Sequence, residues 1–179
     1  MKPYFWIFGF LLITIILVLL VIQTTVPDVS VIERSAIINA PDSVVHDQIA
    51  TIKNWERWSP TRAANTQTVM RYSRLVSGKG AYYTWQSGLN KDDSSKLTIV
   101  VDEPNRIGYV IETNSKTATT AYFQLKPIYN TTEVSWRIEC ETLTPIDKLM
   151  AMMMENKTSF HLEKALHCLD SVCVRDKTN

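Results

Sequence analysis

Residues 132–147 read TEVSWRIECETLTPID and contain both elements that decide the fold. The first half alternates apolar with polar or charged residues, which is the period-two pattern of a strand with one buried face. Its apolar positions are Val134, Trp136, Ile138 and Cys140. The second half begins a helix, because Thr144 suits an N-cap, Pro145 suits the first helical position and Asp147 completes a capping-box variant. The stretch predicts a half-buried strand followed by a long C-terminal helix.

Period-two alternation recurs upstream and predicts an antiparallel sheet. Four further runs lie between residues 81 and 125, and short turn sequences separate them. Because such connections are too short for βαβ units, adjacent strands are expected to form antiparallel hairpins. Two weaker strands are expected at 29–38 and 68–76, which gives about seven in all. The predicted inward positions carry no charge, and they are Ala81, Tyr83, Trp85, Leu97, Ile99, Val101, Ile107, Tyr109, Ile111, Ala121, Phe123, Leu125, Val134, Trp136, Ile138 and Cys140.

Helical spacing appears at two places. Pro41 suits a first helical position and apolar residues then recur at helical intervals, so a short helix is expected over 42–52. The long C-terminal helix has two apolar faces, which lie nearly opposite each other. One comprises Ile146, Leu149, Met150 and Met153, and the other comprises Leu162, Leu166, Leu169 and Cys173. Either a bend near residues 155–159 or a break into two helices would reconcile the two faces.

The N-terminal segment is long and apolar enough to cross a membrane. Every residue from 4 to 22 is apolar or aromatic except Gly9 and Thr14, and 19 residues at about 1.5 Å each nearly match a hydrocarbon core of about 30 Å. No small-residue cleavage site follows, so an uncleaved anchor is expected. Lys2 precedes the segment, which by the positive-inside rule puts the N-terminus in the cytoplasm and the remainder on the periplasmic or extracellular side. We expect an anchor and linker over 1–28 and one domain over 29–179.

The composition excludes some classes of partner. Nineteen lysines and arginines balance 18 acids, so the net charge of +1 offers no general attraction to nucleic acid. Three cysteines cannot all pair within one chain, and a domain of this size needs no disulfide to bury its core. The cysteine count therefore leaves the redox compartment undecided.

Four short stretches resemble a known family. Residues 33–41 (ERSAIINAP) look like its first strand running into its helix, and residues 54–60 (NWERWSP) look like its tryptophan-rich segment. Residues 78–85 (GKGAYYTW) and 132–136 (TEVSW) are similar to later strands. The chain thus resembles the membrane-anchored branch of the START-like polyketide cyclase/dehydrase superfamily. The resemblance implies an α+β helix-grip fold, in which about seven antiparallel strands surround the long helix and leave a hydrophobic cavity, and many relatives only bind ligands.

The candidate ligand-binding residues are those expected to face this cavity. Tyr83 and Tyr109 could donate hydrogen bonds to a ligand or be core aromatics, and Met150 and Met153 could line the cavity or fill the core. Trp58 could cap the cavity mouth or pack a helix on the sheet. The full candidate set is Trp58, Tyr83, Trp85, Ile99, Tyr109, Phe123, Trp136, Met150 and Met153.

No catalytic residue, metal site or cofactor is expected. The carboxylates of Asp102, Glu112 and Glu139 fall on the outer face or at strand ends, where they are solvated. The histidines and cysteines of the C-terminal helix do not share a face at ligand spacing, and they are His161, His167, Cys168 and Cys173.

Three functions remain open at this point. The first is non-catalytic binding of a hydrophobic small molecule or lipid at a membrane, in transport or sensing. The second is a cyclase- or dehydrase-like enzyme that uses the cavity tyrosines. The third is a membrane-anchored interaction domain whose pocket has filled.

Overall fold

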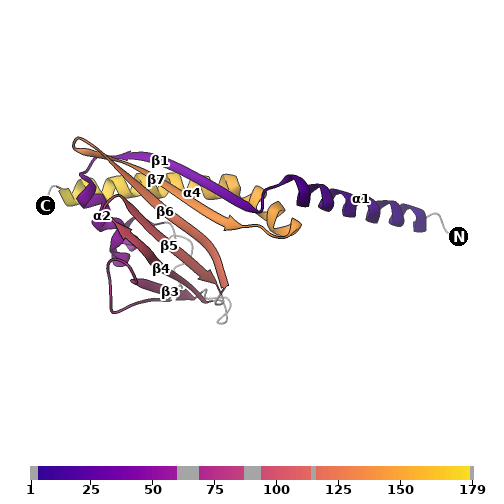
Figure 1. Cartoon of the computed structure of the whole chain (residues 1–179), viewed down its shortest axis with the longest axis horizontal. Helices are drawn as coiled ribbons and strands as arrows, with labels where there is room; N and C mark the ends of the chain where they lie inside the picture. Colours follow the sequence, from indigo (N-terminus) through magenta and orange to yellow (C-terminus); the bar gives the residue numbers. More distant parts are fainter. Residues whose placement is uncertain (1–3, 60–68, 87–93, 114–115, 178–179) are drawn as a thin grey trace.

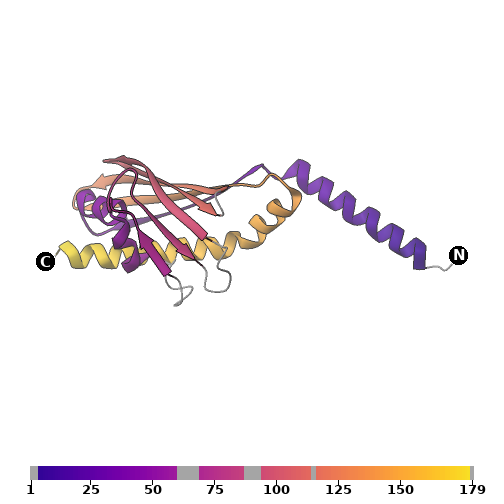
Figure 2. The ribbon, with the colours of Figure 1, turned by 90° about the horizontal axis from the view of Figure 1, so that it is seen from below.

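The computed structural model describes residues 4–59, 69–86, 94–113 and 116–177. Helix α1 projects from one end of an α+β domain, whose curved sheet packs against the long helix α4 (Figures 1 and 2). The elements in chain order are α1 (Tyr4–Thr25), β1 (Val29–Ile38), α2 (Asp42–Ala50), η1 (Ile52–Asn54), α3 (Trp55–Trp58), β2 (Val69–Tyr72), β3 (Tyr82–Gln86), β4 (Ser94–Glu103), β5 (Arg106–Thr113), β6 (Lys116–Ile128), β7 (Thr131–Glu141) and α4 (Pro145–Lys177).

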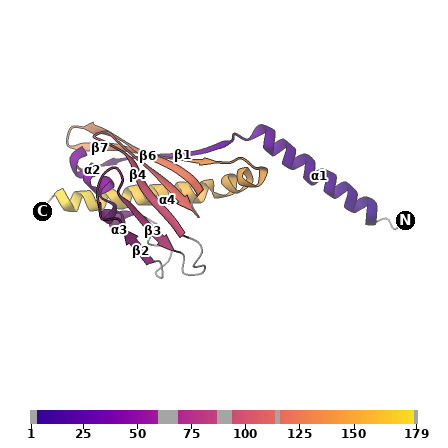
Figure 3. The same cartoon turned by 60° about the horizontal axis from the view of Figure 1, so that its bottom comes forward.

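The described strands form one seven-stranded antiparallel sheet in the order β1-β7-β6-β5-β4-β3-β2. Strands β2 to β7 follow one another as a meander, and β1 closes the sheet beside β7. Helix α4 runs along the inner face, and α2 and α3 cover the same face at the end away from α1 (Figure 3). This is the helix-grip arrangement that the sequence predicts, and the strand at 29–38 has the predicted bounds. The strand expected at 68–76 is shorter, because β2 ends at Tyr72.

Alternation sets which side chains enter the core. Tyr83, Leu97, Tyr109, Phe123 and Trp136 are all buried at inward positions of five successive strands. Apolar burial of this kind stabilises the fold by about 25 cal/mol per Å² removed from water. The period-two prediction is therefore confirmed for the centre of the sheet.

A β-bulge in β4 reverses the prediction at that strand's end. The register shifts between Ile99 and Val101, so that Val101 lies opposite Gly108 on the outer face. Asp102 then lies opposite the buried Ile107 and turns inward, where its carboxylate is 3.0 Å from Nε2 of His46 on α2. The inward assignment of Val101 was wrong, because a bulge inserts one residue and exchanges the two faces. Asp102 is exposed near the end of β4, as expected for a carboxylate at a strand end.

The first helical segment is divided in three. Helix α2 ends at Ala50, two residues before the expected end, because Thr51 is extended and forms a bridge with Ser77. The backbone N–H of Ile52 also donates to the carbonyl of Val76. Residues 51 and 52 therefore pair with the segment between β2 and β3 and do not continue the helix. The short helices η1 and α3 then carry the tryptophan-rich residues across the inner face.

Helix α4 begins as predicted and is one continuous helix of 33 residues. The Thr144 hydroxyl accepts from the Asp147 backbone N–H at 3.1 Å and donates to its carboxylate at 2.7 Å. The same carboxylate accepts from the Thr144 backbone N–H at 3.0 Å, which completes the capping box. The hydrogen bonds from the Thr144 hydroxyl and backbone N–H lower the pKa of Asp147. The alternative of two helices is wrong, and Figure 2 shows that the N-terminal part of α4 curves instead.

A buried lysine joins α1 to α4. Lys148 is only 1% exposed, and its Nζ donates to the carbonyls of Gln23 at 2.8 Å and Val26 at 2.6 Å. Its ammonium also lies 2.9 Å from the carboxylate of Asp28. The last carbonyls of a helix lack intrahelical partners and carry partial negative charge, which suits a cation. Lys148 thus fixes where α4 begins relative to the end of α1.

An ion pair fixes α3 at the other end of the domain. Arg57 donates both guanidinium arms to Asp176 of α4 at 2.6 and 2.7 Å, and Gln48 of α2 donates to the same carboxylate at 2.9 Å. The hydrogen bonds from Arg57 are the main reason that the pKa of Asp176 lies below its ordinary 3.8. A carboxyl whose folded pKa is depressed stabilises the fold above its unfolded pKa, and this contribution is lost as the pH falls.

We expect Asp176→Asn to lower the thermal midpoint at pH 7 by about 2–4 °C, which corresponds to about 1 kcal/mol for a chain of this size. The difference from the unsubstituted protein should shrink as the pH falls below 3.8 towards the depressed pKa of the folded state, because protonation then removes the carboxylate charge that Asp176→Asn lacks. Thermal denaturation of the full chain in detergent at several pH values measures this. Glu155→Gln, an exposed acid on the same helix, serves as the control. A difference that is independent of pH would contradict the role of the ion pair.

Candidate functional site

A cavity of about 300 Å³ lies between the inner face of the sheet, α3 and the middle of α4. This volume is at the lower end of the range of about 300–1,000 Å³ that small-molecule sites occupy. Its lining is mainly aromatic and aliphatic, and it comprises Trp55, Ser59, Tyr83, Trp85, Leu97, Tyr109, Ile111, Trp136, Ile138, Thr158, His161 and Leu162.

Pairs of residues two apart on the strands give the cavity a base and a mouth. Tyr109 and Trp136 are buried and form part of the base. Two residues further along the same strands, Ile111 and Ile138 are half-buried and lie towards the mouth. The last residue of β7, Glu141, pairs with Val29 just after α1, so Ile138 lies nearer to α1 than Trp136 does. The mouth is therefore on the α1 side of the base.

Tyr109 brings a hydrogen-bond donor to the base. The indole N–H of Trp136 donates to the Tyr109 hydroxyl oxygen at 3.0 Å, and no described residue accepts the hydrogen of that hydroxyl. Burial raises the pKa of Tyr109 far above its ordinary value of 10, so the phenol stays neutral and keeps its proton. An apolar cavity with one oriented donor at its base can bind a ligand that carries a hydrogen-bond acceptor.

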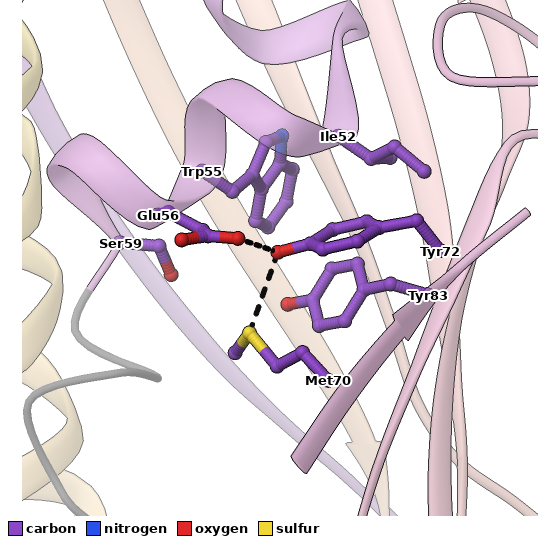
Figure 4. A pocket seen from close by; sticks show the side chains of 7 residues that line it. All are labelled: Ile52, Trp55, Glu56, Ser59, Met70, Tyr72 and Tyr83. Carbon is purple, nitrogen blue, oxygen red and sulfur yellow. Dashed lines mark hydrogen bonds between the residues drawn. The ribbon is translucent and has the colours of Figure 1, made fainter. Parts of the chain in front are cut away.

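A small polar niche adjoins the cavity (Figure 4). In it the Tyr72 hydroxyl donates to the carboxylate of Glu56, and Ser59 and Tyr83 line the same space. The niche has a volume of about 10 Å³, which is room for about one water molecule. Trp55, Ser59 and Tyr83 line both the niche and the cavity. The cavity is therefore apolar along its length and polar at the end beside α3.

Two ionisable residues near the cavity were not predicted to lie there, because the sequence reasoning considered His161 only as a metal ligand and did not consider Glu56. Glu56 comes from α3, and no local spacing marked it, since Ser59 just after the helix is extended. His161 comes from α4 and lines the cavity at its exposed rim. The strand residues that line the cavity carry no charge, as expected. The helices, in contrast, place ionisable residues beside it.

Four of the nine predicted ligand-binding residues line the cavity, and they are Tyr83, Trp85, Tyr109 and Trp136. Ile99 and Phe123 are fully buried in the core outside the cavity. Trp58 packs there as well, with its indole N–H donating to the carbonyl of Gln48 at 3.2 Å. Its neighbour Trp55 is also buried and packs edge to face on Tyr109, and it lines the cavity as well.

Met150 and Met153 do not line the cavity. Their side chains are 51% and 71% exposed, on the face of α4 that points away from the sheet. The cavity is lined from α4 by residues one or two turns later, namely Thr158, His161 and Leu162. The prediction for the two methionines was wrong, because the sequence shows two apolar faces on the helix but not which of them meets the sheet.

Within the described residues no cluster of three histidine, cysteine or acidic side chains has the geometry to hold a metal ion. All three cysteines are described, and each is a free thiol. Burial, with a smaller effect from Asp170 and Asp176, raises the pKa of Cys173 to about 12, so this thiol stays protonated and packs as an apolar residue.

Solved structures of other proteins share the fold of this chain. A crystal structure from Rhodobacter sphaeroides matches with a TM-score of 0.59 and 15% identity, covering 82% of this chain and 93% of that one. A solution structure from Thermobifida fusca gives 0.58 and 17%, with coverage of 81% and 93%. A crystal structure from Mycobacterium smegmatis gives 0.57 and 13%, with coverage of 84% and 99%. At these identities the likeness concerns the fold.

None of the curated proteins compared with this chain matches it in sequence. The family model described as "Polyketide cyclase / dehydrase and lipid transport" matches residues 30–173, which include the sheet, the cavity and nearly all of α4. The chain belongs to this polyketide cyclase/dehydrase and lipid transport family.

Proposed function

We propose that this protein binds a small hydrophobic molecule or lipid at a membrane, without catalysing a reaction. The observation that carries the proposal is the apolar cavity with the neutral Tyr109 hydroxyl at its base. The preferred ligand has an apolar body and one hydrogen-bond acceptor, such as a carbonyl or ether oxygen. A nucleic-acid partner is not proposed, since the net charge is +1.

The energetics favour such a ligand. Transfer of its apolar surface from water into the aromatic lining is favourable by about 25 cal/mol per Å². The Tyr109 hydroxyl is buried, so an acceptor that reaches it forms a hydrogen bond away from bulk water. A ligand without an acceptor would leave this buried donor unused.

The ionisable groups near the cavity do not favour acid/base catalysis. A general base needs a pKa near the working pH and a free acceptor in reach of the substrate. The Glu56 carboxylate already accepts from Tyr72, and the raised pKa of Tyr109 keeps it protonated. His161 sits at the rim, where a ligand can leave and water can enter.

Helix α1 supports the membrane part of the proposal. Its residues Trp6–Thr25 have a mean hydropathy of 2.8 and are long and apolar enough to cross a bilayer, and none of them is buried in the domain. We propose that α1 is a single-pass anchor. Lys2 before it favours a cytoplasmic N-terminus, with the domain on the periplasmic or extracellular side.

The ligand proposal can be tested with two compounds of nearly equal size, 2-acetylnaphthalene and 2-ethylnaphthalene. We expect the acetyl compound to bind the full chain about 3- to 10-fold more tightly, because only it accepts a hydrogen bond. Quenching of tryptophan fluorescence measures binding, since Trp55, Trp85 and Trp136 line the cavity.

Tyr109→Phe should abolish the difference between the two compounds, and Tyr129→Phe, at a fully exposed position, should preserve it. Ile111→Trp should weaken the binding of both compounds by filling the mouth. Equal affinities of the unsubstituted protein for both compounds would refute the role of Tyr109, and unchanged binding by Ile111→Trp would refute the cavity as the site.

Sidedness can be tested in a bacterial host with reporters fused to the C-terminus of the full chain. We expect an alkaline phosphatase fusion to be active and a green fluorescent protein fusion to be dark, because the positive-inside rule exports the domain. Lys2→Glu should reduce the phosphatase activity. A fluorescent fusion together with an inactive phosphatase would reverse the proposed orientation.

A cyclase- or dehydrase-like enzyme is the second candidate, and the position of His161 in the cavity lining favours it. In such an enzyme His161 would move a proton at the mouth while the cavity tyrosines orient the substrate. His161→Gln separates the two functions, since a passive carrier should keep its affinity for 2-acetylnaphthalene within about twofold, as for other exposed positions.

A further inference from the structure

The N-terminal half of α4 carries an apolar surface that no described part of the chain covers. Leu149, Met150, Met152, Met153 and Met154 are all exposed. Ile146 is 65% exposed and Leu143, just before the helix, is 63% exposed. From residue 149 to residue 157 no side chain of α4 is buried, although the helix has buried residues on both sides of this stretch. A surface of this kind is costly in water and indicates a binding partner.

This surface has one consistent direction. Ile146, Leu149, Met150 and Met153 recur at intervals of three and four, so they share one face of α4. Lys148 lies on the opposite side, where it reaches the end of α1. We call the four residues the outer apolar face.

The outer apolar face lies next to the end of α1, and this position indicates what covers it. Besides the contacts of Lys148, the Gln23 side chain donates to the carbonyl of Leu143 at 3.3 Å, and the Thr142 hydroxyl donates to that of Pro27 at 3.0 Å. The face therefore begins beside the last turn of α1. Met153 lies about 10 Å along the helix from Ile146, so the whole face stays within about 10 Å of the end of α4 that adjoins α1.

We propose that the outer apolar face of α4 lies in the interfacial layer of the bilayer that α1 spans. A protein partner fits less well, because the residues that dominate binding energy at protein interfaces are mostly tryptophan, tyrosine and arginine, and this face has none of them. The contact would bring the mouth of the cavity close to the lipid, since Thr158 and His161 follow this stretch of α4 directly. The proposal rests on α1 being the membrane anchor, as proposed above.

Depth-dependent fluorescence quenching of the full chain tests the proposal. Cys140→Ser and Cys168→Ala remove the half-buried thiols, while the buried Cys173 stays because it reacts poorly. A bimane probe is then attached through Met153→Cys, or through Lys164→Cys as the matched control, about 16 Å further along the same helix. The protein is reconstituted in phosphatidylcholine vesicles that contain lipids with a nitroxide near the headgroup.

We expect quenching at position 153 to exceed that at position 164 by about twofold or more. Leu149→Asp together with Met150→Asp should lower quenching at 153 to the level at 164, because charge is expelled from the interface. Lys157→Asp, at an exposed polar position, should leave it unchanged. Equal quenching at 153 and 164 in the unsubstituted helix would overturn the proposal, and disulfides between 153 positions of two copies would then identify a second copy as the partner.

A further probe separates this proposal from the anchor on which it rests. Bimane at Leu12→Cys should be quenched by a nitroxide deep in the acyl chain. Quenching at 12 without quenching at 153 overturns only the membrane contact of α4. Loss of quenching at both positions overturns the anchor as well.

Discussion

A cluster of aromatic rings holds the layers of this domain at a fixed separation. The ring of Trp55 meets those of Tyr109 at 5.2 Å and Phe123 at 5.9 Å, both edge to face, and the ring of Trp58 meets that of Trp136 at 6.0 Å. Such pairs add about 0.5–1.5 kcal/mol each to the burial of their surfaces. The indole N–H groups of Trp55 and Trp58 donate to α2 carbonyls, which stops either ring from turning. The cavity begins where this cluster ends, so its size depends on rings that cannot be compressed.

Much of the fold could be predicted because its signals are local. Alternation marks each strand, short turns force antiparallel neighbours, and the capping box at Thr144 marks the start of α4. The resemblance of four short stretches supplied the three-dimensional arrangement. Tyr83, Trp85, Tyr109 and Trp136 were identified as cavity residues because alternation places them on the inner face and the cavity extends along that face.

The parts that were not predicted depend on non-local geometry. The bulge at Ile99 and Val101 leaves no local sequence sign, yet it turns Asp102 towards His46 and moves Val101 to the outer face. The alternation of apolar and polar residues predicts only the positions of strand residues. It therefore did not predict that Glu56 of α3 lies near the cavity. Which apolar face of α4 packs on the sheet depends on how far the sheet extends along the helix. The sheet ends before it reaches Met150.

The buried lysine connects the end of α1 to the helix that lines the cavity. A lysine that is 1% exposed must satisfy its charge locally, and the carbonyls of Gln23 and Val26 with the Asp28 carboxylate are its acceptors. Removing these acceptors would leave a buried charge without compensation, which costs several kcal/mol. The same helix continues from Lys148 to the cavity lining at Thr158 and Leu162. Any displacement of α4 by a ligand must therefore either move the end of α1 or break these contacts. Because breaking them is costly, a movement of the end of α1 is the cheaper response to such a displacement.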